Sequence, residues 1–418
     1  MITAIKNARV ITPYEILENH AVIIEDGKIA GVEKNNELEG RSFDRVIDAG
    51  GNYLSPGFID IHNHGNSGHD VMDSTFDALD SMARFHAKHG VTGFLATTIT
   101  SSVENIEKAI RNVADYMSFQ ERGNSCTGIE DKTGTAGGET ETKSGPAHKG
   151  NLKAGLLGIY LEGPYFSMAR KGAQPAEYIK NPSVGEVENF IKISRNTIRI
   201  VALAPELPGA PEVIFYLKSR GITVSAGHTD AGFAEAKRGI DCGITQATHI
   251  FNGMRGFSHR EPGAAGAFLT DERVACEMIC DGVHLHPAAM RLVSGAKGKD
   301  GIILISDAMM ACGLSDGEYE LGGQKVMVKN GQARLADGTL AGSTLTMNKA
   351  VYNMVHMVGV SLCDAVRMAT LNPARACGLA RKKGSIEVGK DADLVIFDDN
   401  VNVIAVIIGG KSGSIPIV

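Results

Sequence analysis

The sequence predicts a (β/α)8 barrel, a TIM-like fold, joined to a small β-sandwich domain that both ends of the chain build. Through the middle of the chain, short apolar runs alternate with amphipathic helical patterns. The two ends instead contain short strand patterns separated by turns. The apolar runs of the middle part repeatedly end in His, Glu or Asp, as expected for a barrel whose functional residues follow its strands.

The small domain is predicted from strand patterns at residues 4–10, 21–25, 28–32 and 45–48, with Asp26-Gly27 as a hairpin turn. After Gly378, strand patterns return at 384–388, 394–397 and 401–408. Neither end has enough apolar residues for a core of its own, so we expect both to pair in one domain. We expect this domain to comprise 1–55 and 379–418, and the barrel to comprise 56–378.

The barrel is predicted from eight strand patterns, because parallel strands need helical crossovers between them. The patterns occupy residues 58–62, 93–97, 156–161, 198–203, 223–226, 246–249, 275–279 and 302–306. Helical periodicity is clearest at 76–89, 103–117, 210–220, 287–296, 344–358 and 361–377. Residues 122–151 are rich in Gly, Thr, Ser, Lys and Glu and are expected to form an exposed insertion, with a lid or an oligomer contact as alternatives. Residues 319–341 contain turn signals and are expected to form hairpins outside the barrel.

Length and composition narrow the classes of function. The chain has 418 residues, of which 43% are hydrophobic and 22% charged, as in a globular enzyme or binding protein. A formal charge of −6 and the lack of a basic stripe argue against nucleic acid as a partner. No apolar run is long enough to cross a bilayer, and Lys6, Asn7 and Arg9 interrupt the N-terminal run. We therefore expect a cytoplasmic protein without a membrane partner.

Four histidines and a glutamate have the chemistry of metal ligands. His62 and His64 are two residues apart at the end of a strand pattern, so both side chains project from one face. His228, His249 and Glu162 each follow or end another strand pattern. A single pair of histidines could merely cap a strand, but the repetition favours a site for one or two divalent ions with open positions for water.

Asp307, at the end of the last strand pattern, is the candidate acid–base residue. A bound metal lowers the pKa of water towards about 7, and a nearby carboxylate can take the proton as hydroxide attacks a carbonyl. The same carboxylate can then protonate a leaving amine. The alternative for Asp307 is a structural role as a helix cap or ion-pair partner.

Eight short motifs resemble the N-acetylglucosamine-6-phosphate deacetylases of the amidohydrolase superfamily, along nearly the whole chain. The motifs are Pro56-Gly-Phe-Ile-Asp-Ile-His-Asn-His64, Leu161-Glu-Gly-Pro-Tyr165, Ala226-Gly-His-Thr-Asp230, Thr248-His-Ile-Phe-Asn-Gly-Met254, Arg260-Glu-Pro-Gly263, Asp281-Gly-Val-His284, Ser306-Asp-Ala308 and Ala341-Gly-Ser-Thr-Leu-Thr-Met347. The resemblance implies hydrolysis of the acetamide of N-acetyl-D-glucosamine 6-phosphate to D-glucosamine 6-phosphate and acetate, in amino-sugar catabolism. It also implies that metal-bound hydroxide attacks the carbonyl while Asp307 acts as general base and acid.

The resemblance also implies the ligand and substrate residues. Glu162, His228 and His249 hold the metal common to the family, and His62 with His64 completes a second site bridged by Glu162. The substrate-binding residues would be Asn252, Gly253, Arg260 and His284, with Arg260 reaching across from the partner subunit of a homodimer. Where some members carry a histidine, this chain has Gln174, which can orient a substrate but cannot carry a proton charge.

The sequence leaves several alternatives open. His and carboxylate ligands accept zinc or iron, and also manganese or cobalt. The epimeric substrate N-acetylgalactosamine 6-phosphate differs at one hydroxyl, and no residue pattern identifies the groups that meet it. Hydrolysis of a cyclic amide or a dipeptide is a more distant alternative. A barrel that has lost catalysis and serves as a scaffold is the alternative outside enzymology.

Overall fold

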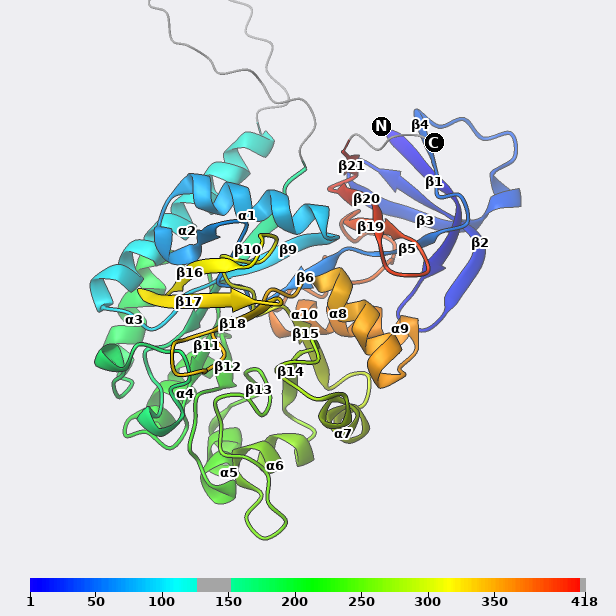
Figure 1. Ribbon diagram of the computed structural model, residues 1–418. Helices are drawn as coiled ribbons and strands as arrows, with labels where there is room; N and C mark the ends of the chain where they lie inside the picture. Colours follow the sequence, from blue (N-terminus) through cyan, green and yellow to red (C-terminus); the bar gives the residue numbers. More distant parts are fainter. Residues whose placement is uncertain (126–151, 414–418) are drawn as a thin grey trace, which may run out of the picture.

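A computed structural model describes residues 1–125 and 152–413 (Figure 1). The middle of the chain forms one parallel eight-stranded sheet in the order β15-β14-β13-β12-β11-β10-β9-β6. Its strands are β6 (Phe58–Asp60), β9 (Val91–Thr97), β10 (Gly155–Glu162), β11 (Ile198–Leu203), β12 (Thr223–Ala226), β13 (Gln246–Ala247), β14 (Ala275–Ile279) and β15 (Ile302–Ile305). The Asp307 N–H donates to the His62 carbonyl at 2.9 Å and brings the two ends of the sheet together. The predicted barrel is confirmed.

Helices connect the barrel strands and cover their outer side. They are α1 (Phe76–Lys88), α2 (Val103–Ser125), α3 (Val184–Ile193), α4 (Ala210–Ser219), α5 (Phe233–Cys242), α6 (Gly263–Thr270), α7 (Pro287–Lys297), α8 (Met347–Asn353), α9 (Leu362–Ala369) and α10 (Leu371–Ala376), with a π-helical turn at Met354–Val358. Side-chain oxygens of Thr75, Ser183 and Ser361 accept backbone N–H groups at the starts of α1, α3 and α9. None of the described helices has the length and apolar character needed to cross a membrane.

Two helical predictions differ from the structure. The helix expected at 361–377 is divided at Thr370 into α9 and α10, because Thr370 leaves helical geometry before Pro373. Helix α2 extends to Ser125, so the first residues of the expected 122–151 insertion are helical. The remainder of that insertion, residues 126–151, lies outside the described residues.

The small domain contains both ends of the chain in one continuous sheet, with the order β21-β20-β19-β5-β1-β2-β3 and β4 paired with β1. Its strands are β1 (Ile2–Ile11), β2 (Ile16–Glu25), β3 (Lys28–Lys34), β4 (Arg45–Asp48), β5 (Tyr53–Pro56), β19 (Leu394–Phe397), β20 (Val403–Ile408) and β21 (Lys411–Ser412). Apolar side chains from both ends share one core that includes Ile5, Leu54 and Ile396. The prediction that both ends build a small β domain is confirmed.

The strand expected at 384–388 is wrong, because this segment forms turns. Gly384 and Gly389 both have φ of 88°, in the left-handed region that interrupts a strand. Gly384, Ser385 and Ile386 are buried, whereas residues 387–389 are exposed. Strand β5 was not expected and forms the link between the two domains, since it pairs with β1 and β19 and leads directly into β6.

The hairpins expected at 319–341 are confirmed as the antiparallel sheet β16 (Gly317–Leu321), β17 (Gln324–Lys329) and β18 (Gln332–Arg334) (Figure 1, yellow). Leu321, Val326 and Val328 pack with Ile99 and Met309, which follow barrel strands. The Gln324 amide donates to the Ala173 carbonyl at 2.6 Å. These contacts fix the small sheet over the ends of the barrel strands.

Candidate metal centre

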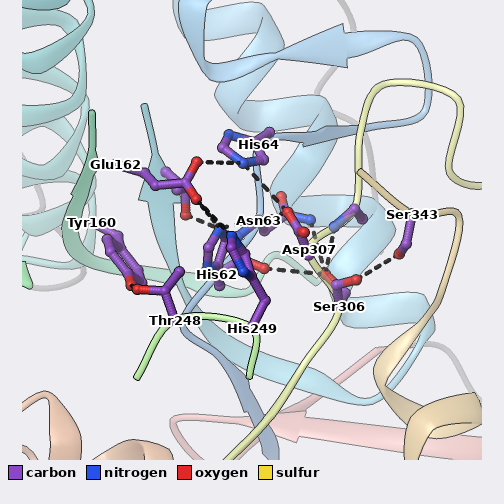
Figure 2. A network of polar contacts seen from close by, with 12 residues as sticks. His62, Asn63, His64, Tyr160, Glu162, Thr248, His249, Ser306, Asp307 and Ser343 are labelled. Carbon is purple, nitrogen blue, oxygen red and sulfur yellow. Dashed lines mark hydrogen bonds and ion pairs between the residues drawn. The ribbon is translucent and has the colours of Figure 1, made fainter. Parts of the chain in front are cut away.

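Six polar side chains from five barrel strands converge at one end of the barrel. His62 and His64 follow β6, Glu162 ends β10, and His228, His249 and Asp307 follow β12, β13 and β15. Figure 2 shows the rings of His62 and His64 beside the carboxylates of Glu162 and Asp307. Within each of two groups, His62–His64–Asp307 and Glu162–His228–His249, the potential ligand atoms lie within 4.8 Å of one another. All six residues are buried.

Glu162 contacts both groups. Its Oε1 lies 3.3 Å from His249 Nε2, 3.4 Å from His228 Nε2 and 3.5 Å from His62 Nε2. Its Oε2 lies 3.2 Å from His64 Nε2. Asp307 Oδ1 lies 3.5 Å and 3.4 Å from the Nε2 atoms of His62 and His64. Glu162 therefore lies between the two groups of potential ligands.

The hydrogen bonds of the rings show that these residues fit divalent cations. His228 Nδ1 lies 3.0 Å from the Arg170 carbonyl, and His249 Nδ1 lies 3.0 Å from the Asn252 carbonyl. A nitrogen that faces a carbonyl must donate, so each neutral ring carries its lone pair on Nε2. These two Nε2 atoms are only 3.2 Å apart. His62 Nε2 is buried without a hydrogen-bond partner among the described residues. A cation satisfies lone pairs that converge in this way.

The electrostatics of the centre keep both carboxylates ionised. Burial alone would raise the pKa of Glu162, but the charge of His62 and hydrogen bonds from His228 and His249 hold it well below its usual range. Burial acts the same way on Asp307, whose pKa the neighbouring His62 and His64 lower to about 2. Burial disfavours charged His249, but its contact with Glu162 raises its pKa to about 9, so a metal ion would bind its Nε2 in place of a proton. The centre therefore offers negative charge that a metal ion can neutralise.

Three of these residues have an unusual backbone. The φ angles of His228, His249 and Asp307 are 45°, 29° and 48°, in the left-handed region that non-glycine residues rarely occupy. Each such residue costs about 1–3 kcal/mol, and such strain is concentrated at functional sites. At Asp307 the conformation is held by the His62 carbonyl, which accepts its N–H, and by the Ser343 N–H, which donates to its carbonyl at 2.7 Å.

A pocket of about 310 Å³ opens above the centre. Most of the expected substrate residues line it, namely Gln174, Asn252, Gly253 and His284. The Asp281 carboxylate contacts His284 Nδ1 at 2.6 Å and fixes this ring. Arg260 is exposed on the loop before α6 and does not line the pocket of its own chain.

Comparison with known proteins decides the family. The model of the amidohydrolase family matches residues 53–413. The chain belongs to the amidohydrolase family. It is 40% identical over 408 residues to N-acetylglucosamine-6-phosphate deacetylase of Bacillus subtilis, covering 97% of this chain and 96% of the relative. It is 38% identical over 414 residues to N-acetylgalactosamine-6-phosphate deacetylase of Escherichia coli O157:H7, covering 99% of this chain and 100% of the relative.

A solved structure agrees with these relatives. It is a mutant of N-acetyl-D-glucosamine-6-phosphate deacetylase from Mycobacterium smegmatis in complex with N-acetyl-D-glucosamine 6-phosphate. It matches this amidohydrolase with a TM-score of 0.84 and 32% identity, covering 99% of this chain and 98% of the other. The family resemblance inferred from the motifs is thereby confirmed.

Two charged residues near the centre of this amidohydrolase were not predicted from the sequence. Arg334, at the end of β18, is the one Arg or Lys that lines the pocket in the described part of the chain. Glu277, on β14, lies beneath the centre, and its Oε2 is 2.9 Å from His62 Nδ1. A glutamate inside an apolar strand pattern is a signal that could have identified Glu277. Arg334 has no comparable signal, because its position depends on how the hairpins pack.

Gln174 contacts protein groups in addition to lining the pocket. Its Nε2 donates to Glu162 Oε2 at 2.8 Å, while its Oε1 accepts the Thr100 N–H at 2.9 Å. Gln174 therefore lines the pocket and also touches a metal-ligand candidate. The amide is oriented by the backbone of the loop after β9.

Proposed function

We propose that this amidohydrolase removes acetate from N-acetyl-D-glucosamine 6-phosphate and releases D-glucosamine 6-phosphate. The observation that carries the proposal is the convergence of four His ring nitrogens and two ionised carboxylates at the base of a pocket of about 310 Å³. The relative from Mycobacterium smegmatis, crystallised with N-acetyl-D-glucosamine 6-phosphate, supports this substrate. Hydrolysis of an amide needs a water activated near neutral pH, and the centre has the ligands for that chemistry.

The centre is proposed to hold two divalent ions, zinc or iron before manganese or cobalt. His62 and His64 would hold one ion, with Asp307 beside it, and His228 and His249 would hold the other, with Glu162 between them. Bound divalent ions lower the pKa of a water and polarise a carbonyl oxygen. Side chains and backbone groups of the protein are proposed to carry out proton transfer and to orient the substrate.

Asp307 is proposed to move the proton. Its carboxylate is ionised, so it can accept the proton of the attacking water and then deliver it to the amide nitrogen as the C–N bond breaks. The Ser343 and His62 backbone contacts hold it in place during both transfers. The ring of His284, fixed by Asp281, and the backbone at Gly253 are proposed to orient the sugar phosphate.

Arg334 is proposed to supply positive charge for the phosphate from within the chain. Its guanidinium donates to the Gly338 carbonyl at 2.7 Å and to Gln332 Oε1 at 3.0 Å, and both acceptors are neutral. Among residues 1–125 and 152–413, no carboxylate forms an ion pair with it. The charge of Arg334 is therefore not neutralised by a partner.

Replacing Arg334 by Met is expected to raise KM for the 6-phosphate substrate about 10- to 100-fold, the effect of a hydrogen bond to a charged group. We expect kcat to change much less, since the residue is proposed to bind rather than react. Arg334→Lys, which keeps the charge, should recover part of the loss. Equal losses of kcat/KM for the phosphorylated sugar and for N-acetylglucosamine would show instead that Arg334 only holds the hairpin.

Arg260 is proposed to serve the pocket of a second copy in a homodimer, since it is exposed and absent from its own pocket. The loop that carries it lies between His249 and α6, next to the pocket residues Asn252 and Gly253. A short reach across a two-fold interface would suit such a position.

The experiment that tests the function is acetate release measured side by side on the gluco and galacto 6-phosphates, with metal content determined on the same sample. We expect release from the gluco epimer and about two equivalents of metal per subunit. Higher kcat/KM on the galacto epimer would move the assignment to the reaction named for the Escherichia coli relative. Protein that binds no metal and releases no acetate would indicate a scaffold.

A further inference from the structure

We propose that Glu277 is a positioning residue that fixes the two proposed metal-ligand groups relative to each other. The inference rests on the metal-dependent function proposed above. Glu277 lies on β14, whose other residues are Ala275, Cys276, Met278 and Ile279, and its side chain is fully buried. A carboxylate inside a barrel is costly unless hydrogen bonds and opposite charge compensate for its lost hydration.

One oxygen of this carboxylate contacts both groups. Oε2 lies 2.9 Å from Nδ1 of His62, which belongs to the first group. The same oxygen accepts the backbone N–H of His249, which belongs to the second group, at 3.3 Å. The backbone carbonyl of Glu277 also accepts the Ile250 N–H at 2.9 Å. Glu277 thus holds a ring of one group and the strained turn of the other.

The carboxylate is itself held by the barrel. Its second oxygen, Oε1, accepts a hydrogen bond from the Gln246 side chain on the neighbouring strand β13. Strands β13 and β14 pair directly, with Gln246 opposite Ala275 and Ala247 opposite Cys276. The position of Oε2 is therefore set by the sheet, before any ion binds.

His62 differs from His228 and His249 in having an anionic partner at Nδ1, the ring nitrogen that faces away from Glu162. His228 and His249 donate from Nδ1 to neutral backbone carbonyls, whereas His62 Nδ1 faces a carboxylate. A carboxylate partner fixes the ring orientation and makes the opposite nitrogen a better electron donor. His62 Nε2 then points at Glu162 and Asp307, 3.5 Å from each. We therefore expect Glu277 to strengthen chiefly the binding of the ion that His62 and His64 would hold.

Zn²⁺ binding to Glu277→Gln tests the assignment, because Gln keeps the shape and removes the charge. We expect the weaker of two Zn²⁺ dissociation constants to rise about 10- to 100-fold, the usual effect of losing such a partner. Zinc content after dialysis against a buffered chelator should fall from about two equivalents to about one. The matched comparison is Gln246→Met, which removes the other partner of Glu277 but keeps its carboxylate and should therefore weaken Zn²⁺ binding less than Glu277→Gln does.

The outcomes separate a positioning role from a general loss of stability. A structural role alone would lower the apoprotein Tm in both variants and leave Zn²⁺ affinity unchanged, which would overturn the proposal. If Glu277→Gln does not fold, Glu277→Asp is used in its place. The shorter side chain withdraws the carboxylate from His62, and we expect the same loss of zinc. Wild-type protein that binds no Zn²⁺ refutes the proposed function. Wild type with two ions and a Glu277→Gln variant of equal affinity refutes only this inference.

Discussion

The Asp307→Asn variant is expected to lose about 100- to 10 000-fold in kcat, the contribution of a positioned general acid–base group. Asn has nearly the same shape, but it cannot accept the proton of water or donate one to the leaving nitrogen. The backbone contacts of residue 307 with His62 and Ser343 do not involve its side chain and should hold the substituted residue in place. Steady-state kinetics on N-acetyl-D-glucosamine 6-phosphate measure the loss.

The metal content of this variant decides how the loss is interpreted. The amide oxygen of Asn can still face His62 and His64, so we expect the protein to retain its metal. Asp281→Asn is a useful control, because Asp281 holds His284 in the pocket wall and should change KM more than kcat. Full activity of Asp307→Asn with normal metal content would exclude Asp307 as the proton carrier.

Removing the metal is expected to have the second large effect. Chelation of the wild-type protein should lower acetate release more than about 1000-fold, since metal activation of water and carbonyl contributes several kcal/mol. Added Zn²⁺ or Mn²⁺ should restore it. Glu162→Gln should show the same loss without restoration, because Glu162 lies within 3.5 Å of all four histidine Nε2 atoms.

Glu206 provides the matched control for Glu162. It is also a glutamate beyond a barrel strand, but it accepts hydrogen bonds from Thr229 and from the Asp230 N–H at 2.6 Å, outside the centre. Glu206→Gln should therefore retain metal and most of the activity. Elemental analysis of both variants measures the contrast, and a Glu162→Gln protein with full metal content would contradict the proposed ligand set.

The barrel and the six polar residues of the centre could be predicted because both depend on local patterns. Short apolar runs that end in His, Glu or Asp identify a strand and its functional tip together. Residues 263–270 form a helix that was missed, since all but the last are buried and the segment has no polar face to give it a helical period. Thr370 divides a helix whose periodicity continues across it.

The residues missed in the site depend on long-range packing. The partner of Glu277 is His62, 215 residues away in the sequence, and the contact exists only when the barrel closes. Arg334 reaches the pocket because the small sheet packs against Ile99 and Met309. The turn signals at 319–341 predict the hairpins but not the barrel residues against which the hairpins pack. Local propensity cannot specify such contacts.

The pairing of β5 affects the order in which a newly made chain can assemble. Strand β5 leads through Gly57 into β6 and the first two histidines, and its outer neighbour is β19, with Tyr53 opposite Phe397. A nascent chain that has emerged as far as α10 contains all six residues of the centre but lacks this neighbour. Such distant pairing is a slow step in folding. The first ligand-bearing strand is therefore anchored on both sides only after β19 has been synthesised.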